Sequence, residues 1–374
     1  MKPAVLVTGG AGYIGSVTCK ALAKAGYLPV VYDNLSRGHR YAVKWGPLEE
    51  HDLEDRGALC AVFHSYRPVA VLHFAGYAYV GESMAAPGLY FQNNVVNSLT
   101  LLECMRECGL GTIVFSSSCA TYGLPLEVPI RENHPQNPIS PYGESKRAVE
   151  AALRWYGMSN GLKWTAFRYF NAAGADPDGQ AGENHVPEAH LIPLTIEAGM
   201  GMRPHVEVYG TDYPTPDGTA IRDYVHVTDL AEAHVRGLEY LLKGGQSRAF
   251  NLGTGRGYSV REVVSTIEHV MGVKGIARNA VRRAGDPPEL VADASSSATV
   301  LGWKPQFSDI HTIVNTAFDW HVSRLPEAST SSGDRELFRS GWPTRTSVVS
   351  TNIFSQNFIA QGSWNDNIRN RRRD

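Results

Sequence analysis

A tyrosine and a lysine stand four residues apart in the stretch "PYGESK", as Tyr142 and Lys146. The proline before them and the alanine-rich sequence after them predict the start of a helix, on which positions i and i+4 share a face. A phenol beside an ammonium group can be an ordinary surface pair. It can also be a proton acceptor whose pKa the cation lowers. The rest of the sequence has to separate these two interpretations.

A glycine-rich turn near the amino terminus predicts a dinucleotide site. Residues 4–8 are a short apolar run typical of a buried strand, and Gly9, Gly12 and Gly15 follow in "GGAGYIG" before a helical pattern begins. Between a strand and a helix, such glycines let the backbone approach a pyrophosphate at the helix amino terminus. Asp33 ends the next apolar run, "PVVYD". A carboxylate there binds a ribose diol and repels a 2′-phosphate, which favours NAD over NADP.

The chain beyond this turn alternates predicted strands and helices. The expected strands are 69–73, 112–116 and 164–168, and the expected helices lie around 55–65, 88–108 and 143–160. This alternation predicts an α/β fold, a doubly wound parallel-sheet Rossmann domain with helices on both faces.

The composition of the sequence changes after residue 171. We expect a mainly NAD-binding domain over 1–171, to which a segment near 225–255 returns through the strand-like "AFNLGTG", and a smaller mixed α/β substrate-binding domain over 172–325. From 326 to 374 the periodicity ends, which predicts a disordered tail.

Composition excludes several classes of protein. The 374 residues carry a formal net charge of −2, which gives no electrostatic footprint for nucleic acid. Five cysteines are few and odd in number, and fit a reducing compartment better than a disulfide framework. The sequence shows neither a signal peptide nor an apolar run long enough to cross a bilayer, so we expect a cytoplasmic protein without membrane contact.

Three further motifs carry a resemblance to a known family. "FSSSCATYG" (115–123), "PYGESK" and "FRYFNAAGA" (167–175), together with the glycine turn, resemble the extended short-chain dehydrogenases/reductases. Within that family four longer stretches are similar to the UDP-glucose 4-epimerases: "HFAGYAYVGES", "GENHVPEAHLIPL", "GTDYPTPDGTAIRDYVHVTDLAEAH" and "RRAGDPPELVADAS". The similarity runs from about residue 3 to residue 322, and the tail has no counterpart in it.

This resemblance implies reversible C4 epimerisation of UDP-glucose and UDP-galactose. Tyr142 would take the proton of the sugar 4-OH while hydride passes from C4 to tightly held NAD, and the transient 4-ketose would receive hydride on its other face. A free phenol has a pKa of about 10, too high for a good base at neutral pH, and a cation favours the phenolate. Lys146 would supply that cation, and Ser118 would bind the sugar oxygen.

The resemblance also implies the residues that bind the two ligands. The cofactor set is Gly9, Gly12, Tyr13, Ile14, Gly15, Asp33, Asn34, Asp52, Leu53, Phe74, Ala75, Gly76, Asn93, Ser116, Tyr142, Lys146, Tyr169 and Phe170. The substrate set is Ser118, Tyr142, Asn171, His190, Leu191, Tyr209, Arg222, Arg283, Asp286 and Leu290. Arginine suits the diphosphate because its planar fork pairs with phosphate oxygens. No metal is expected.

Two positions depart from the family pattern. Ala78 stands where related enzymes often carry a lysine near the nicotinamide ribose and the substrate. Leu290 stands where enzymes that exclude N-acetylated sugars often carry a tyrosine, so we expect partial tolerance of UDP-GlcNAc.

Other functions remain open on this scaffold. A 4,6-dehydratase needs an Asp-Glu pair where this chain has Cys119 and Ala120, which argues against it. A UDP-pentose or UDP-GlcNAc 4-epimerase shares the chemistry, and a non-catalytic NAD-binding sensor would normally lack a catalytic group. The resemblance further implies a homodimer, in which the helices around 88–108 and 143–160 pair with their copies as a four-helix bundle.

Overall fold

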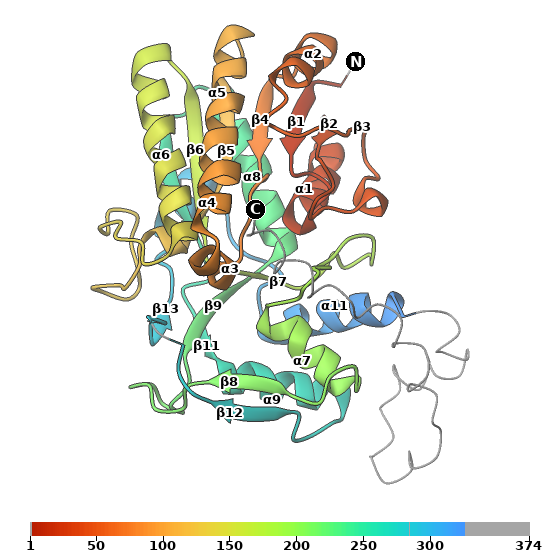
Figure 1. Ribbon diagram of the computed structural model, residues 1–374, viewed down its shortest axis with the longest axis vertical. Coiled ribbons are helices and arrows are strands. Elements are labelled where there is room, and N and C mark those ends of the chain that lie inside the picture. Colours follow the sequence, from red (N-terminus) through yellow and green to blue (C-terminus); the bar gives the residue numbers. More distant parts are fainter. Residues whose placement is uncertain (1, 284, 326–374) are drawn as a thin grey trace, which may run out of the picture.

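A computed structural model describes residues 2–283 and 285–325 of the chain, and Figure 1 shows its layers. The centre is a seven-stranded sheet in the order β10-β6-β5-β4-β1-β2-β3, in which every neighbouring pair is parallel. Its strands are β1 (Ala4–Thr8), β2 (Leu28–Tyr32), β3 (Leu48–Glu49), β4 (Ala70–His73), β5 (Thr112–Ser118), β6 (Lys163–Tyr169) and β10 (Arg248–Leu252). The predicted parallel α/β sheet is therefore confirmed, and so is the return of "AFNLGTG" to it.

Helices cover both faces of this sheet. One face packs against α2 (Arg56–Tyr66), α5 (Asn97–Glu107) and α6 (Pro141–Asn160). The other packs against α1 (Tyr13–Lys24) and α8 (Val227–Leu242). Figure 1 shows α5 and α6 side by side in front of the sheet and α8 behind it. Two separate apolar cores result, one between the sheet and each layer of helices.

Local sequence explains where α6 begins and ends. Ser140 caps its amino terminus by accepting a hydrogen bond from the Gly143 backbone N–H, and Pro141 occupies the first helical position. Gly161 ends the helix in the left-handed conformation, with φ of 71°. The helix expected around 143–160 thus forms, with the Tyr142 and Lys146 pair in its first turns.

The helix expected over 88–108 is not continuous. It consists of α4 (Pro87–Tyr90), a π-helical segment η2 (Phe91–Val96) and α5. The wide turn of η2 directs Asn94 inward, where its amide donates to the Tyr77 carbonyl and to Ser145 Oγ, each at 3.0 Å. Such interruptions occur frequently at functional sites. Apolar spacing alone did not show this one, because the deviation serves a polar contact.

The second half of the chain forms smaller sheets with their own apolar core. Strand β9 (Ile221–His226) pairs with β7 (Asn171–Ala173), β11 (Gly257–Ser259) and β13 (Glu289–Leu290), and β8 (Val206–Tyr209) pairs with β12 (Ala277–Ala280). Helices α7 (Leu191–Gly199), α9 (Val260–Met271) and α11 (Ile310–Ser323) pack around that core. The remaining short helices are α3 (Val80–Ala85), α10 (Ser295–Leu301), η1 (Arg40–Ala42) and η3 (Cys119–Thr121).

The tail predicted over 326–374 lies outside the described residues. Among the helices that the structure describes, none is both long and apolar enough to cross a membrane.

Candidate active site

The glycine turn after β1 forms a close-packed cradle. Gly9 has φ of 71°, and a Cβ built on it would lie 2.5 Å from the Ala75 backbone nitrogen. A Cβ on Gly15 would lie 2.3 Å from the Gly9 carbonyl oxygen. At Gly12 the packing is less tight, since a Cβ would lie 3.3 Å from the Gly9 carbonyl oxygen. This arrangement fits a pyrophosphate that approaches the backbone at the amino terminus of α1.

Asp33 completes the cradle from the end of β2. Its carboxylate accepts hydrogen bonds from the backbone N–H of Ala11 at 3.0 Å and of Leu35 at 2.8 Å. Burial raises the pKa of Asp33, and these two backbone bonds oppose that shift. Arg37, the nearest cation in sequence, forms an ion pair with Glu82 at 2.7 Å. A carboxylate at this point and an engaged arginine both fit NAD rather than NADP.

A pocket opens beside this cradle at the carboxyl ends of the strands. Residues of the predicted cofactor set that line it are Gly9, Asp33, Asn34, Asp52, Leu53, Ala75, Gly76 and Asn93. Side chains that sequence reasoning did not select line it too: Tyr32, Ser36, Arg37, His51, Tyr77 and Asn97. In the sequence, only their position close to residues of the predicted cofactor set indicates a role for them. The pocket lies at the switch point between β1 and β4, where parallel α/β sheets bind ligands.

The other residues of the cofactor set do not line this pocket. The Tyr13 hydroxyl donates to the Gly174 carbonyl at 2.5 Å, and Ile14 packs under the sheet. Phe74 packs against the His234 ring, with ring centroids 4.6 Å apart. The Ser116 and Tyr169 hydroxyls lie 2.7 Å apart on neighbouring strands.

Tyr142 and Lys146 both point into the protein. Tyr142 is 7% exposed and Lys146 is 5% exposed, so the surface-pair interpretation is wrong. The Lys146 ammonium donates to the Ser116 carbonyl at 2.8 Å and lies 6.0 Å from the centre of the Tyr142 ring. Burial lowers the pKa of Lys146 to about 8, although the nearby Glu150 carboxylate raises it. The lysine therefore keeps its positive charge at neutral pH.

The phenol of Tyr142 has an unfavourable environment for ionisation in the protein alone. Burial raises its pKa well above the ordinary value, Tyr169 adds to that shift, and Ser118 opposes it. Ser118 also serves the fold, because its Oγ accepts a hydrogen bond from the Ala120 N–H at 3.1 Å and caps η3. Ser118 therefore caps the end of the strand and also lies beside the phenol of Tyr142.

A buried ion pair fixes α6 against the sheet. Arg168 on β6 and Glu150 on α6 lie 2.6 Å apart with side chains only 6% and 2% exposed. Ser117 donates to the same carboxylate at 2.6 Å, and the Tyr122 hydroxyl contacts the guanidinium at 3.0 Å. The pair sets the position of the helix that carries Tyr142.

Half of the predicted substrate residues lie on β8, β9, β13 and the segment before β13. Arg222 pairs with Asp286 at 2.5 Å, and the Arg283 guanidinium lies 4.0 Å from the centre of the Tyr209 ring. Leu290 pairs with Arg222 in the register of β13 and β9. Leu290 also packs against the apolar cluster that contains Cys119 and Phe170. Cys119 directly follows Ser118 in the sequence.

The remaining members of the substrate set come from β7 and the loop before α7. Asn171 opens β7, where it pairs with Tyr224 of β9. His190 is the amino-terminal flanking residue of α7, and Leu191 is the first residue of that helix. Ala78, at the position of the missing lysine, is exposed.

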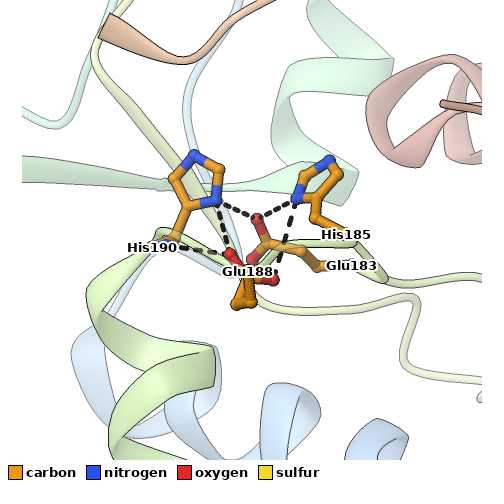
Figure 2. Close-up of side chains that lie close together, drawn as sticks. All are labelled: Glu183, His185, Glu188 and His190. Carbon is orange, nitrogen blue, oxygen red and sulfur yellow. Dashed lines mark hydrogen bonds and ion pairs between the residues drawn. The ribbon is translucent and has the colours of Figure 1, made fainter. Parts of the chain in front are cut away.

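One polar cluster was missed by sequence reasoning. Glu183, His185, Glu188 and His190 bring potential metal-binding atoms within 4.8 Å of one another (Figure 2). The spacing E-x-H-x-x-E-x-H in "GENHVPEAH" was the signal that could have revealed it. No metal was expected from the sequence, because that stretch was interpreted only through its resemblance.

Comparison with known proteins agrees with this geometry. The sequence profile of the NAD dependent epimerase/dehydratase family matches residues 5–253. A UDP-glucose 4-epimerase of Rhizobium leguminosarum bv. trifolii is 52% identical over 318 residues, which cover 85% of this chain and 97% of the relative. The crystal structure of a UDP-glucose 4-epimerase from Brucella ovis in complex with NAD superposes with a TM-score of 0.83 at 52% identity, covering 85% of this chain and 98% of the other.

A further solved structure has a wider substrate range in its name. It is the UDP-Glc/GlcNAc 4-epimerase of Campylobacter jejuni, with a TM-score of 0.76 at 40% identity, covering 86% of this chain and 99% of the other. The profile match, the full-length relatives and the dinucleotide cradle lead to one conclusion. This chain belongs to the NAD dependent epimerase/dehydratase family.

Proposed function

We propose that this chain is an NAD-dependent enzyme that interconverts UDP-glucose and UDP-galactose by inverting the configuration at C4. The observation that carries the proposal is the placement of Tyr142, Lys146 and Ser118. Ser118 ends β5, and Tyr142 and Lys146 lie in the first turns of α6. Lys146 Nζ lies 3.5 Å from the position that a Cβ on Gly76 would take, and Gly76 lines the pocket that suits a dinucleotide. Relatives that match the chain over most of its length carry this activity in their names.

Each catalytic residue has a role that follows from its surroundings. NAD, when bound, accepts a hydride from the sugar, returns it, and brings a positively charged nicotinamide ring. The Tyr142 oxygen takes the proton of the sugar 4-OH and later gives it back. Because burial raises the pKa of this phenol, it needs positive charge nearby to act as a base. Lys146, protonated at neutral pH, supplies part of that charge.

Two arginines, Arg222 and Arg283, hold the UDP group. Arg222 and Arg283 present guanidinium groups that match phosphate oxygens. Asp286 orients Arg222 through its 2.5 Å ion pair, and the Tyr209 ring supports Arg283. With the diphosphate bound in this way, we expect the sugar to lie near Ser118 and Tyr142.

The site does not suit nucleotide-sugar dehydration. Elimination of water from the sugar needs a general acid and base next to Ser118. Cys119 holds that place, and burial raises the pKa of its thiol to about 12. Its neighbour Ala120 has no ionisable group, so neither position supplies the required proton transfers.

A second substrate, UDP-GlcNAc, is favoured by a specific observation. Leu290 packs against the apolar cluster that contains Cys119 and Phe170, and its side chain is smaller than that of tyrosine. We propose that this smaller side chain leaves room for an N-acetyl group. UDP-xylose and UDP-arabinose lack the C6 hydroxymethyl group of the hexoses and would fit the same site, so they belong in the same assay.

We also propose a homodimer formed through α5 and α6. Apolar side chains stand exposed on these neighbouring helices, among them Leu99 on α5, and Trp155 and Met158 on α6, which are 67% and 77% exposed. An exposed apolar patch of this kind marks an interaction surface. A second copy of the same two helices would bury it as a four-helix bundle.

Light scattering measures this assembly directly. We expect a species of twice the 40.9 kDa chain mass, and dissociation on Trp155→Lys combined with Met158→Lys. Met202→Lys, at a residue that is 61% exposed outside these helices, is the matched control and should leave the mass unchanged. A monomeric wild type would refute the dimer.

We place the enzyme in the cytoplasm. All five cysteines are free thiols, which supports a reducing compartment.

A panel of UDP-sugars tests the proposed activity. The purified chain is incubated with UDP-galactose, UDP-glucose, their N-acetyl forms, UDP-xylose and UDP-glucuronate, and the epimeric products are separated by chromatography. We expect UDP-galactose and UDP-glucose to interconvert without added NAD(H) being consumed. Turnover of none of these sugars, while NAD remains bound, would refute the epimerase and favour an NAD-binding sensor.

A further inference from the structure

Two imidazoles and two carboxylates meet in the loop between β7 and α7 (Figure 2). His190 Nδ1 lies 2.8 Å from Glu183 Oε1 and 2.9 Å from Glu188 Oε1. His185 Nδ1 lies 3.1 Å from Glu183 Oε1 and 3.8 Å from Glu188 Oε2. Glu188 contacts the two imidazoles with different oxygens, and one ligand atom of each of the four residues lies within 4.8 Å of the others. Both carboxylates are buried, with side chains 7% and 8% exposed.

These separations suit a tetrahedral metal centre. Bonds of about 2.0 Å from zinc to nitrogen or oxygen set neighbouring ligand atoms roughly 3.3 Å apart in a tetrahedron. The four measured separations lie on both sides of that value. Two neutral imidazoles and two carboxylates carry two negative charges, which a divalent cation cancels. A mixed nitrogen and oxygen set selects a transition metal over Mg²⁺ or Ca²⁺, which prefer oxygen ligands alone.

A second observation distinguishes this cluster from a simple network of ion pairs. His185 Nδ1 is buried and has no hydrogen-bond partner of adequate geometry among the described residues, although it faces Glu183. A lone pair directed at a cation needs no such partner, whereas a proton on that nitrogen would.

The cluster joins the cofactor end of the molecule to the substrate half. The His185 ring packs edge-on against Tyr13, the first residue of α1, and against Tyr79, with centroids 6.3 and 5.7 Å apart. The Trp320 ring N–H on α11 donates to the Glu183 carbonyl at 2.8 Å. His190 directly precedes α7, which begins with the candidate substrate residue Leu191.

We propose that Glu183, His185, Glu188 and His190 form a closed structural site for a divalent transition metal ion, with Zn²⁺ as its best fit. Four protein ligands leave no open position for a water or a substrate, which is the pattern of a structural rather than a catalytic zinc site. The ion links these four residues of the loop before α7 to one another, next to Tyr13 and Tyr79. Of the four ligands, His190 also belongs to the predicted substrate set, while the proposed epimerase chemistry itself needs no metal.

The experiment uses the full-length, tag-free chain, stripped with a chelator and then given one equivalent of ZnCl₂. After desalting, metal analysis should find about one zinc per chain, and the melting temperature should rise relative to the stripped protein. CoCl₂ in place of zinc should give the intense visible absorption of tetrahedral cobalt. MgCl₂ should produce neither retention nor a shift in melting temperature.

Two variants and a control make the assignment specific. His185→Gln and Glu188→Gln each remove one ligand, and each should weaken zinc binding at least tenfold while the stripped protein keeps its melting temperature near that of the stripped wild type. His64→Gln, at an exposed histidine on α2, should bind zinc like the wild type. Failure of the wild type to retain zinc, or equal retention by His185→Gln, would overturn the site. UDP-galactose turnover, measured on the same samples, shows whether the epimerase proposal stands independently of that result.

Discussion

At the scale of single residues, burial affects the ionisation of the candidate catalytic groups more than direct contact between their charges does. Tyr142 and Lys146 lie on one face of α6, but the ammonium is bonded to the Ser116 carbonyl rather than to the phenol. The pKa of Tyr142 is therefore raised by burial in the protein alone. We therefore expect ionisation of this phenol to depend on the cofactor as well as on the lysine, and we expect Tyr142 to act as a base only when NAD is in place.

Leu290 provides the residue-scale prediction of substrate range. We expect the wild type to turn over UDP-GlcNAc, and Leu290→Tyr to lower kcat/KM for this sugar by roughly tenfold or more, because the larger ring fills the space for the N-acetyl group. UDP-galactose turnover should change much less. The measurement is kcat/KM for both sugars in both proteins.

Leu242→Tyr is the control for that substitution, since it adds the same ring at a partly exposed position at the end of α8. It should leave both values unchanged. If the wild type does not act on UDP-GlcNAc, or if Leu290→Tyr acts on it equally well, Leu290 does not set the sugar range.

At the scale of elements, the buried Arg168 and Glu150 pair connects α6 to the sheet. Glu150→Ala leaves a buried guanidinium without its partner, which typically costs about 3–5 kcal/mol. Glu144→Ala, on the same helix, removes only the exposed pair with Arg147 and should cost less than about 1 kcal/mol. Urea unfolding of the two variants gives both values. Similar losses in the two would show that the buried pair does not hold the helix.

The elements also show which features the sequence could predict. Strands buried on both faces are near-continuous apolar runs, so β1 and its neighbours were predictable almost to the residue. The dinucleotide cradle was predictable because its glycines lie between a strand and a helix. The π-helical segment η2 was not, because it exists to place the Asn94 amide against Tyr77 and Ser145. Those partners come from elsewhere in the chain.

The same reason explains what was missed in the site. Tyr32, Arg37, His51 and Asn97 line the pocket, but no motif distinguishes them from ordinary residues. The cluster at 183–190 has a visible spacing, yet only the folded loop shows that its four ligand atoms converge. The boundaries predicted between the two domains, at residues 171 and 172, stay a prediction.

At the scale of the whole molecule, buried histidines make the stability depend on pH. Burial lowers the pKa of His73 to about 3, and of His226 and His234 to about 4. In the unfolded chain a histidine titrates near pH 6.5, so below that pH the unfolded state binds more protons and the folded state loses stability. Each of these histidines should remove roughly 2 kcal/mol between pH 7 and pH 5.

His234→Gln isolates one of these contributions. The His234 ring packs between Phe74 and Phe167, and it bonds through Nδ1 to the Leu230 carbonyl at 2.7 Å. The free energy of unfolding of the variant, measured in urea at pH 7 and pH 5, should fall less over that interval than in the wild type, by about 1–2 kcal/mol. His64→Gln should keep the wild-type difference. An unchanged pH dependence in His234→Gln would show that the buried ring is not kept neutral.

The central claim is that Tyr142 transfers the proton at the sugar C4 hydroxyl. The most direct test is the rate of UDP-galactose to UDP-glucose conversion by Tyr142→Phe, beside Tyr240→Phe as a control at a phenol that bonds only to the Gln246 backbone. We predict that Tyr142→Phe retains bound NAD and binds UDP but loses nearly all turnover, at least about a hundredfold, while Tyr240→Phe keeps the wild-type rate. Near-normal epimerisation by Tyr142→Phe would contradict the account.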